Sequence, residues 1–296
     1  MKTPDISPVH DTSAISRMPD WVIAAPARST SEAAFRSGAA LAYLYSAGCA
    51  ANVPQALWRD RLALKAAEVS ANIAGRHEGE IALRDTVHLL RSNDHPGPAG
   101  EILRQWSRAV ARPASIPHLE AVLTGFPVAR IAASFKAADG NPVDLAAGVI
   151  QAVLTETPRA HTAALILADA VIAKALGWDH IVPTLAIALK PRDLRLREDA
   201  LRMACHQAIL QGAVKATALA TDLARRAVRL RDAVPKLRAK GAERAVDVFL
   251  RTDALAPTAL LTFMSDRAAR RLCDRLVSLG VVRELTGRDT FRLYGV

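Results

Sequence analysis

The stretch Ser265–Tyr294 (SDRAARRLCDRLVSLGVVRELTGRDTFRLY) carries the clearest structural signal in this chain of 296 residues. Its first half predicts a helix over Asp266–Leu279, because Ser265 is a favourable N-cap and apolar residues recur every three or four positions. Gly280 stands where a left-handed C-terminal cap belongs, so the helix is expected to end there. The apolar positions that would form one buried stripe are Ala269, Leu272, Cys273, Leu276 and Leu279.

The sequence pattern changes after this helix. Val281–Thr286 and Thr290–Tyr294 are rich in β-branched and aromatic residues, which is typical of strands. The three residues between them predict a tight turn, and the resulting register would place Glu284 opposite Arg292. We therefore expect a β-hairpin at this end of the sequence.

Two shorter helices are expected before the capped helix, over Glu243–Arg251 and Ala256–Leu261. Three helices followed by a hairpin is the order of elements in a winged helix-turn-helix, so residues 241–296 are expected to form such a module. In helix-turn-helix folds the recognition helix enters the major groove of duplex DNA. The candidate DNA-binding residues are the arginines of the third helix and of the hairpin turn, Arg267, Arg270, Arg271, Arg275 and Arg288.

A simpler interpretation of these arginines also stands. Arg270 follows Asp266 by four residues, and Arg271 and Arg275 flank Asp274. Such spacing is typical of a solvated helix face with surface ion pairs. A winged helix can also dock on proteins, so the module by itself does not decide between DNA and a protein partner.

Residues 31–240 are expected to form an all-helical body, preceded by an irregular lead-in over residues 1–30. Alanine and leucine dominate, and both have high helix propensity. Asn141-Pro142 and Thr157-Pro158 are each expected to start a helix, with a capping side chain before a first-turn proline. The fold class is therefore mainly α, a helical bundle followed by a small module with one hairpin. The helices expected in the body span Ser31–Cys49, Pro54–Ala74, Glu78–Leu90, Gly100–Ala111, His118–Leu123, Val128–Ala137, Pro142–Thr155, Pro158–Leu176, Leu185–Leu189 and, as one or two long helices, Asp193–Ala233.

The charge of the chain invites a nucleic-acid partner, because the formal net charge is +10 and the pI is near 10.1. Basic residues concentrate just before the module, where Lys190–Lys240 contains thirteen Lys or Arg and five Asp or Glu. On a continuous helix Arg225 and Arg229 would share a basic face that could follow a phosphate backbone. Pro235 interrupts that helix, however, and Asp222 beside Arg225 favours ordinary surface ion pairs.

The sequence contains no recognisable catalytic, metal or cofactor motif. Its eight histidines lack metal-ligand spacing, and it has neither a glycine-rich phosphate loop nor a nucleophile motif. We therefore expect no enzyme activity and no cofactor. The widely spaced Cys49, Cys205 and Cys273 are typical of free thiols in a reducing cytoplasm. No segment has the pattern of a signal peptide or a membrane span, so a cytoplasmic protein without membrane contact is expected.

Several stretches resemble a bacterial family catalogued as domain of unknown function fourteen-oh-three. They are Arg61–Ala67 (RLALKAA), Leu83–Asp85 (LRD), Asp94–Gly100 (DHPGPAG), Val234–Gly241 (VPKLRAKG) and, most specifically, Met264–Tyr294. The resemblance implies a helical body with a C-terminal winged helix. It brings no activity and no catalytic residues with it.

Two functions therefore compete. In the first, the chain is a DNA-binding protein, either a transcription regulator or a replicon-maintenance factor, whose winged helix grips double-stranded DNA. Its helical body would then form a homodimer or bind a regulatory protein. In the second, the chain is a non-enzymatic adaptor or scaffold whose winged helix docks on a protein partner.

Overall fold

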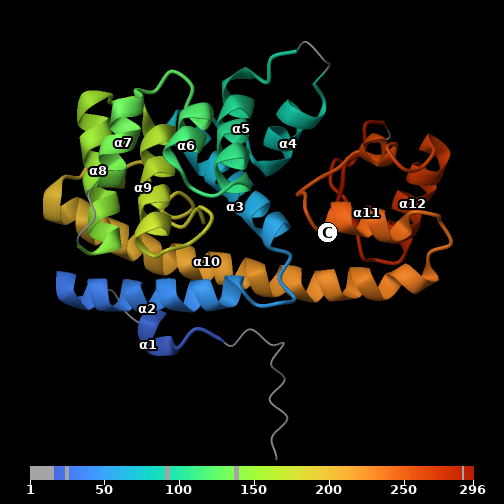
Figure 1. Ribbon diagram of the computed structural model, residues 1–296, viewed down its shortest axis with the longest axis horizontal. Helices are drawn as coiled ribbons and strands as arrows, with labels where there is room; N and C mark the ends of the chain where they lie inside the picture. Colours follow the sequence, from blue (N-terminus) through green and yellow to red (C-terminus); the bar gives the residue numbers. More distant parts are fainter. Residues whose placement is uncertain (1–16, 24–26, 91–93, 137–139, 289) are drawn as a thin grey trace, which may run out of the picture.

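The longest element of the structure is α10 (Glu198–Ala233), a helix of 36 residues. At 1.5 Å per residue it is about 54 Å long, and it extends beneath both the body and the C-terminal segment (Figure 1). The computed structural model describes residues 17–23, 27–90, 94–136, 140–288 and 290–296. Within those ranges the fold is mainly α, as the sequence predicts, with one short β-hairpin near the C-terminal end.

The helices of the body lie in two layers (Figure 1). Helix α2 runs alongside α10, and the helices from α3 to α9 stand above this pair, with α3 and α8 in contact with α10. No helix in the described ranges combines the length and the apolar character needed to cross a bilayer. The short helix α1 (Asp20–Ile23) lies in the lead-in that the sequence predicts to be irregular. The body elements are α2 (Thr30–Gly48), α3 (Gln55–Ile73), α4 (Glu80–His88), α5 (Gly97–Ala111), α6 (Ile116–Val122), α7 (Val128–Lys136), α8 (Pro142–Glu156), α9 (His161–Ala175) and the 3-10 helix η1 (Asp193–Arg195).

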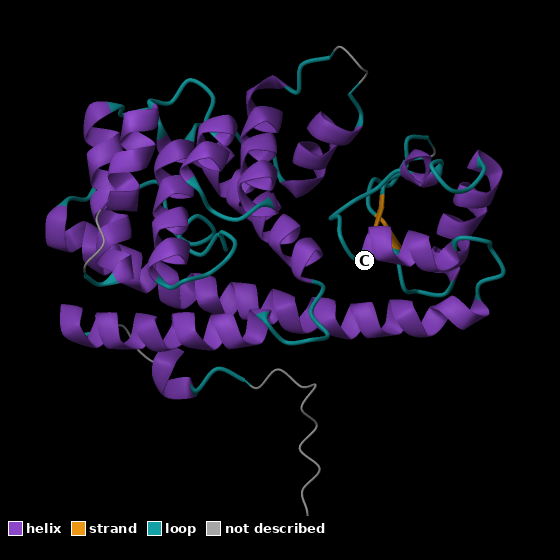
Figure 2. Cartoon of the chain, viewed as in Figure 1, coloured by secondary structure: helices purple, strands orange, loops and turns teal. Residues whose placement is uncertain are grey.

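The C-terminal segment folds beside the far end of α10 and contains the only strands in the described residues (Figure 2). From residue 241 onward its order of elements, three helical segments and then a hairpin, is the order that the sequence predicts. The elements are the 3-10 helix η2 (Val234–Lys236), α11 (Ala242–Phe249), the 3-10 helix η3 (Pro257–Leu260), α12 (Asp266–Ser278), β1 (Arg283–Glu284) and β2 (Tyr294–Gly295).

The structure confirms only one of the two helix starts that the sequence predicts at prolines of the body. The side chain of Asn141 accepts the backbone N–H of Val143 at 2.9 Å, so this helix start is confirmed. The expected start at Pro158 is wrong, because α9 begins three residues later, after a turn in which the N–H of Ala160 donates to the carbonyl of Thr157. The proline lies in that turn and not in the first turn of the helix.

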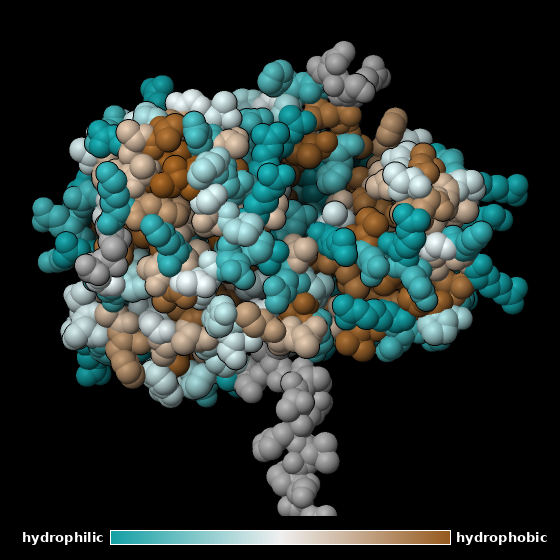
Figure 3. All heavy atoms as spheres, viewed as in Figure 1, coloured by the Kyte–Doolittle hydropathy of each residue, from teal (hydrophilic) through white to brown (hydrophobic). Residues whose placement is uncertain are grey.

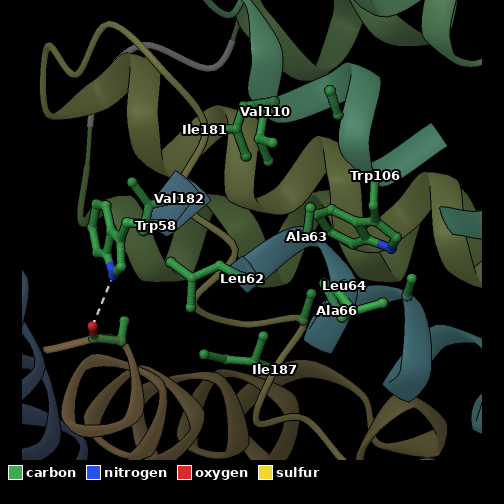
Figure 4. Close-up of a cluster of buried hydrophobic side chains, with 14 of the residues drawn as sticks. Trp58, Leu62, Ala63, Leu64, Ala66, Trp106, Val110, Ile181, Val182 and Ile187 are labelled. Carbon is green, nitrogen blue, oxygen red and sulfur yellow. Dashed lines mark hydrogen bonds between the residues drawn. The ribbon is translucent and has the colours of Figure 1, made fainter. Parts of the chain in front are cut away.

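A buried core joins the two layers where α3 crosses the body (Figure 4). Trp58 and Leu62 of α3 belong to this cluster together with Trp106 and Ile187, and all four side chains are buried. The indole N–H of Trp58 donates to the carbonyl oxygen of Ala216 in α10 at 2.9 Å, so the ring is fixed and its one polar atom is satisfied. The same apolar cluster continues into α11 and α12. The C-terminal segment is therefore packed on the body.

The loop after α9 is held by a buried carboxylate. Asp169 of α9 accepts hydrogen bonds from the backbone N–H groups of Thr184, Leu185 and Ala186, at 2.9 to 3.2 Å, and from the Thr184 hydroxyl. Burial raises the pKa of Asp169 to about 6, while these hydrogen bonds oppose the rise. The expected short helix over Leu185–Leu189 is a single hydrogen-bonded turn instead, in which the N–H groups of Ala188 and Leu189 donate to the carbonyl of Leu185.

The register of the hairpin differs by two residues from the predicted one. Glu284 pairs with Tyr294, and not with Arg292. Tyr294 also exchanges two backbone hydrogen bonds of 2.9 Å with Leu255, so a residue far away in the sequence fixes the position of β2. The Glu284 carboxylate meanwhile accepts the N–H of Gly287, which widens the turn that the sequence predicts to be tight. A shift of two residues leaves each side chain on its expected face.

Candidate nucleic-acid interface

Helix α12 begins at the predicted residue and ends one residue before the predicted end. The hydroxyl of Ser265 accepts the backbone N–H of Ala268 at 3.4 Å, which is the expected N-cap. At the other end the chain turns through Gly280, which has a φ of +67°. A residue without a side chain suits this left-handed conformation. Both caps are encoded locally, so α12 is a well-defined helix of 13 residues.

One face of α12 is buried against the rest of the C-terminal segment. The buried stripe contains Ala269, Leu272, Cys273 and Leu276, each at most 3% exposed. Burial raises the pKa of the Cys273 thiol to about 12, so the thiol stays protonated and unreactive at neutral pH. The buried stripe leaves the opposite face of the helix directed to solvent.

The outward face of α12 carries the predicted arginines. Arg267, Arg271 and Arg275 are exposed, and strongly hydrophilic side chains project from the side of the molecule where Figure 1 places α12 (Figure 3). Arg270 is also exposed, but its Nε lies 2.9 Å from the carboxylate of Asp266, the ion pair that the sequence suggests. The other pairs considered, between Asp274 and its neighbouring arginines, are not formed among the described residues.

Arg288 lies apart from the other four candidates. Its guanidinium forms an ion pair with Asp85 of α4, so it faces the body. Its carbonyl oxygen accepts a hydrogen bond of 3.0 Å from Arg292 Nε. The structure thus brings Arg271 and Arg275 together on one side of α12, with Arg267 nearby on the outward face, and places Arg288 at the contact with the body.

A basic groove runs beside α12. It has a volume of about 880 Å³ and lies between the segment that follows η2, the start of α11, the turn before α12 and α12 itself. Of the thirteen described residues that line it, five are cationic and none is acidic. Five unopposed cations around one groove create a positive field that an anionic ligand would neutralise. The cationic residues are Arg238, Lys240, Arg244, Arg271 and Arg275.

The floor of the groove is apolar, and an aromatic ring in it stacks against one of the arginines. The guanidinium of Arg244 stacks over the ring of Phe263, 4.4 Å from the ring centroid. Gly241, with a φ of +91°, lets the chain turn there, and a Cβ at this position would lie 3.1 Å from the Phe263 ring. Leu237 and Leu272 complete the apolar surface. Arg244 is therefore held in place before any ligand arrives.

Three groove cations were not among the candidates from the sequence. Arg238 and Lys240 lie in the predicted basic zone but beyond the helix, because α10 ends at Ala233, as the sequence predicts, and the chain then turns toward α12. The signal for that turn was Pro235, which lies in η2. Further back on α10, Arg225 and Arg226 both pair with Asp222, so the surface-pair interpretation is confirmed for these residues.

The C-terminal segment is attached to the body through buried ionic contacts. The carboxylate of Asp253, in the loop after α11, is bound by Arg84 of α4 at 2.6 and 3.1 Å and by Arg61 of α3. Arg61 also donates to the main-chain carbonyl of Val296 at 3.2 Å. Asp60 of α3 also accepts a hydrogen bond of 2.9 Å from the backbone N–H of Asp253. These contacts fix the orientation of α12 relative to the body.

A separate polar chain in the body resembles a catalytic triad in its residue types. Ser37 Oγ lies 2.8 Å from Nδ1 of His206, and Nε2 of that ring lies 3.1 Å from a carboxylate oxygen of Asp144. Ser37 and His206 are completely buried, so a substrate cannot reach the hydroxyl. Burial lowers the pKa of His206, although Asp144 opposes this shift. This chain cross-links α2, α8 and α10.

Comparison with known families matches residues 7–296 to the family described as Protein of unknown function (DUF1403). The match spans most of the lead-in, the body and the C-terminal segment, in agreement with the resemblance found in the sequence. A search of the curated proteins finds no match.

Proposed function

We propose that this chain, which belongs to the DUF1403 family, binds duplex DNA through a winged helix-turn-helix formed by residues 241–296. The observation that carries the proposal is the outward face of α12, where Arg267, Arg271 and Arg275 are exposed while the opposite stripe is buried. α12 is the third helical segment of the module, the one that enters the major groove in winged helices. Guanidinium groups suit both guanine edges and phosphates.

Ion pairs within the module reduce the number of arginines that we assign to DNA contact. Arg270 is held by Asp266 and Arg288 by Asp85, and each would have to leave its partner to reach DNA. We therefore assign the main contacts to Arg267, Arg271 and Arg275. Such a protein would act in the cytoplasm as a transcription regulator or a replicon-maintenance factor.

An electrophoretic mobility-shift titration of the full chain with duplex DNA, repeated across salt concentrations, tests this function. The wild-type protein is expected to shift the duplex with an affinity that falls as salt rises, because phosphate contacts release counterions. Arg267→Glu combined with Arg271→Glu should weaken binding at least about thirtyfold, since each such arginine contributes about 1–3 kcal/mol.

A matched control separates this effect from a change of net charge. Arg112 and Arg159 are exposed arginines of the body. Arg112→Glu combined with Arg159→Glu makes the same change in charge and should leave the shift close to that of the wild type. An equal loss in both double variants, or a wild-type protein that shifts no duplex at any salt concentration, would contradict the proposal.

The apolar floor of the groove favours a second candidate function. Leu237 and Phe263, which are partly exposed, could receive the apolar anchors of a protein partner, as in an adaptor. This function predicts a protein partner that stays bound after nuclease treatment and that the Phe263→Ala variant no longer binds. The wild-type chain would then also fail to shift DNA.

A further inference from the structure

We propose that the basic groove beside α12 holds the sugar-phosphate backbone of one strand of the duplex that α12 contacts. This inference rests on the proposed function and extends it to residues that the α12 face does not include, namely Arg238, Lys240 and Arg244. The groove would contribute sequence-independent affinity, while the outward face of α12 would read base edges.

The charge of the groove selects a polyanion. Five of the residues that line the groove are cationic, and none of the described lining residues carries a carboxylate. Duplex DNA carries one negative charge per roughly 1.7 Å of helix axis, so one strand can present several phosphates to such a surface. The 540 Å³ groove between α7 and α8 of the body, by contrast, includes Asp144 and Glu156 in its lining.

The residue types favour phosphate over carboxylate as the bound group. Four of the five cations are arginines, whose planar guanidinium groups bind phosphate oxygens through two parallel hydrogen bonds. Arg244 is already ordered by its stacking on Phe263, so it loses less conformational freedom when it binds. A preorganised arginine in a water-accessible groove is suited to hold a phosphodiester.

The groove also has the right position relative to α12. Arg271 and Arg275 belong both to the helix and to the lining of the groove, whereas the paired Arg270 and Asp266 do not line it. A strand in the groove would therefore run next to the helix. Helix-turn-helix proteins place a phosphate backbone at this location when the recognition helix enters the major groove.

The experiment measures fluorescence anisotropy of a labelled, random-sequence duplex with the full chain across salt concentrations. The test variant is Arg238→Gln with Lys240→Gln and Arg244→Gln. Its expected result is a slope of log affinity against log salt that is shallower by about two to three, because each lost phosphate contact removes roughly 0.9 from the slope. The matched control changes three exposed body arginines, Arg112→Gln with Arg159→Gln and Arg195→Gln, and should retain the wild-type slope.

The outcomes distinguish this inference from the function on which it rests. If the wild type binds DNA and the groove variant keeps the slope of the control, the inference is overturned while DNA binding by α12 stands. If the wild type binds no duplex, both fail. Displacement of the duplex by polyglutamate at equal charge concentration would also overturn the inference, because a carboxylate polymer would then fit the groove equally well.

Discussion

The carboxylate of Asp253 accepts two hydrogen bonds from the guanidinium of Arg84, at 2.6 and 3.1 Å, although 169 positions separate the two residues in the chain. Both side chains are less than 10% exposed. Together with the ion pair between Asp253 and Arg61, this contact holds the C-terminal segment against α3 and α4. α12 and the groove are therefore presented from a fixed platform, and not from a free tail.

Removal of the Asp253 carboxylate should destabilise the protein strongly. Asp253→Asn removes the carboxylate that pairs with Arg61 and leaves Arg84 with only the longer ion pair to Glu80 at 3.4 Å. Loss of one member of a buried ion pair costs about 3–5 kcal/mol. Urea unfolding should show this loss in the free energy of unfolding. Glu120→Gln, at an exposed position of α6, serves as the control and should change stability by less than about 0.5 kcal/mol. A stability of Asp253→Asn equal to that of the control would mean that the buried contacts do not hold the segment.

Gly212 of α10 should tolerate no side chain. A Cβ at this position would lie 2.2 Å from the carbonyl oxygen of Thr184, a residue whose backbone N–H is held by Asp169. Gly212→Ala is therefore expected to lower stability by about 1–3 kcal/mol through overpacking.

The matched control is Gly38 in the middle of α2, where a Cβ would meet no atom within 4 Å. Gly38→Ala should raise stability by about 0.5–1 kcal/mol, because alanine favours the helix. Thermal unfolding of both variants should give shifts of opposite sign. A neutral or stabilising Gly212→Ala would show that α10 does not approach the loop as closely as described.

The buried ring of His206 should make stability depend on pH. Burial lowers its pKa below the ordinary value of 6.5, so below pH 6.5 the unfolded chain binds this proton more readily than the native chain does. Its contribution to stability is present above the unfolded pKa and is lost as pH falls through the native pKa. The stability advantage of the wild type over His206→Gln should therefore shrink between about pH 7.5 and about pH 5.5.

Urea unfolding at several pH values measures this difference, and the comparison with His206→Gln cancels the other titrating groups. A difference that stays constant across the pH range would contradict the assignment. It would indicate that the native protein protonates this ring as readily as the unfolded chain does.

The sequence was most informative where local chemistry determines the structure. Ser265 and Gly280 cap α12 as expected, since each acts within a few residues of its own position. The hairpin register was wrong because Tyr294 is fixed by Leu255, whose position depends on the packing of the whole segment. Local spacing carried no signal for such a long-range bridge.

The candidate site was predictable to a similar extent. The exposure of Arg271 followed from the apolar stripe on the other face of α12. The partner of Arg288 is Asp85, 203 residues away, and a tertiary contact of this kind cannot be deduced from helical spacing. Arg238 and Lys240 reach the groove only because the chain turns after α10, in a direction that Pro235 permits but does not specify.

Photo-crosslinking from α12 tests DNA contact by this helix most directly. Asp274 is exposed on α12 between the proposed contact residues, so p-benzoylphenylalanine in its place removes no cation. The same replacement of Glu120 on the body is the matched control. Irradiation with a labelled duplex at low salt should give a covalent DNA adduct from position 274 and none from position 120. Adducts of equal yield at both positions, or a bound duplex that never crosslinks from position 274, would contradict the account.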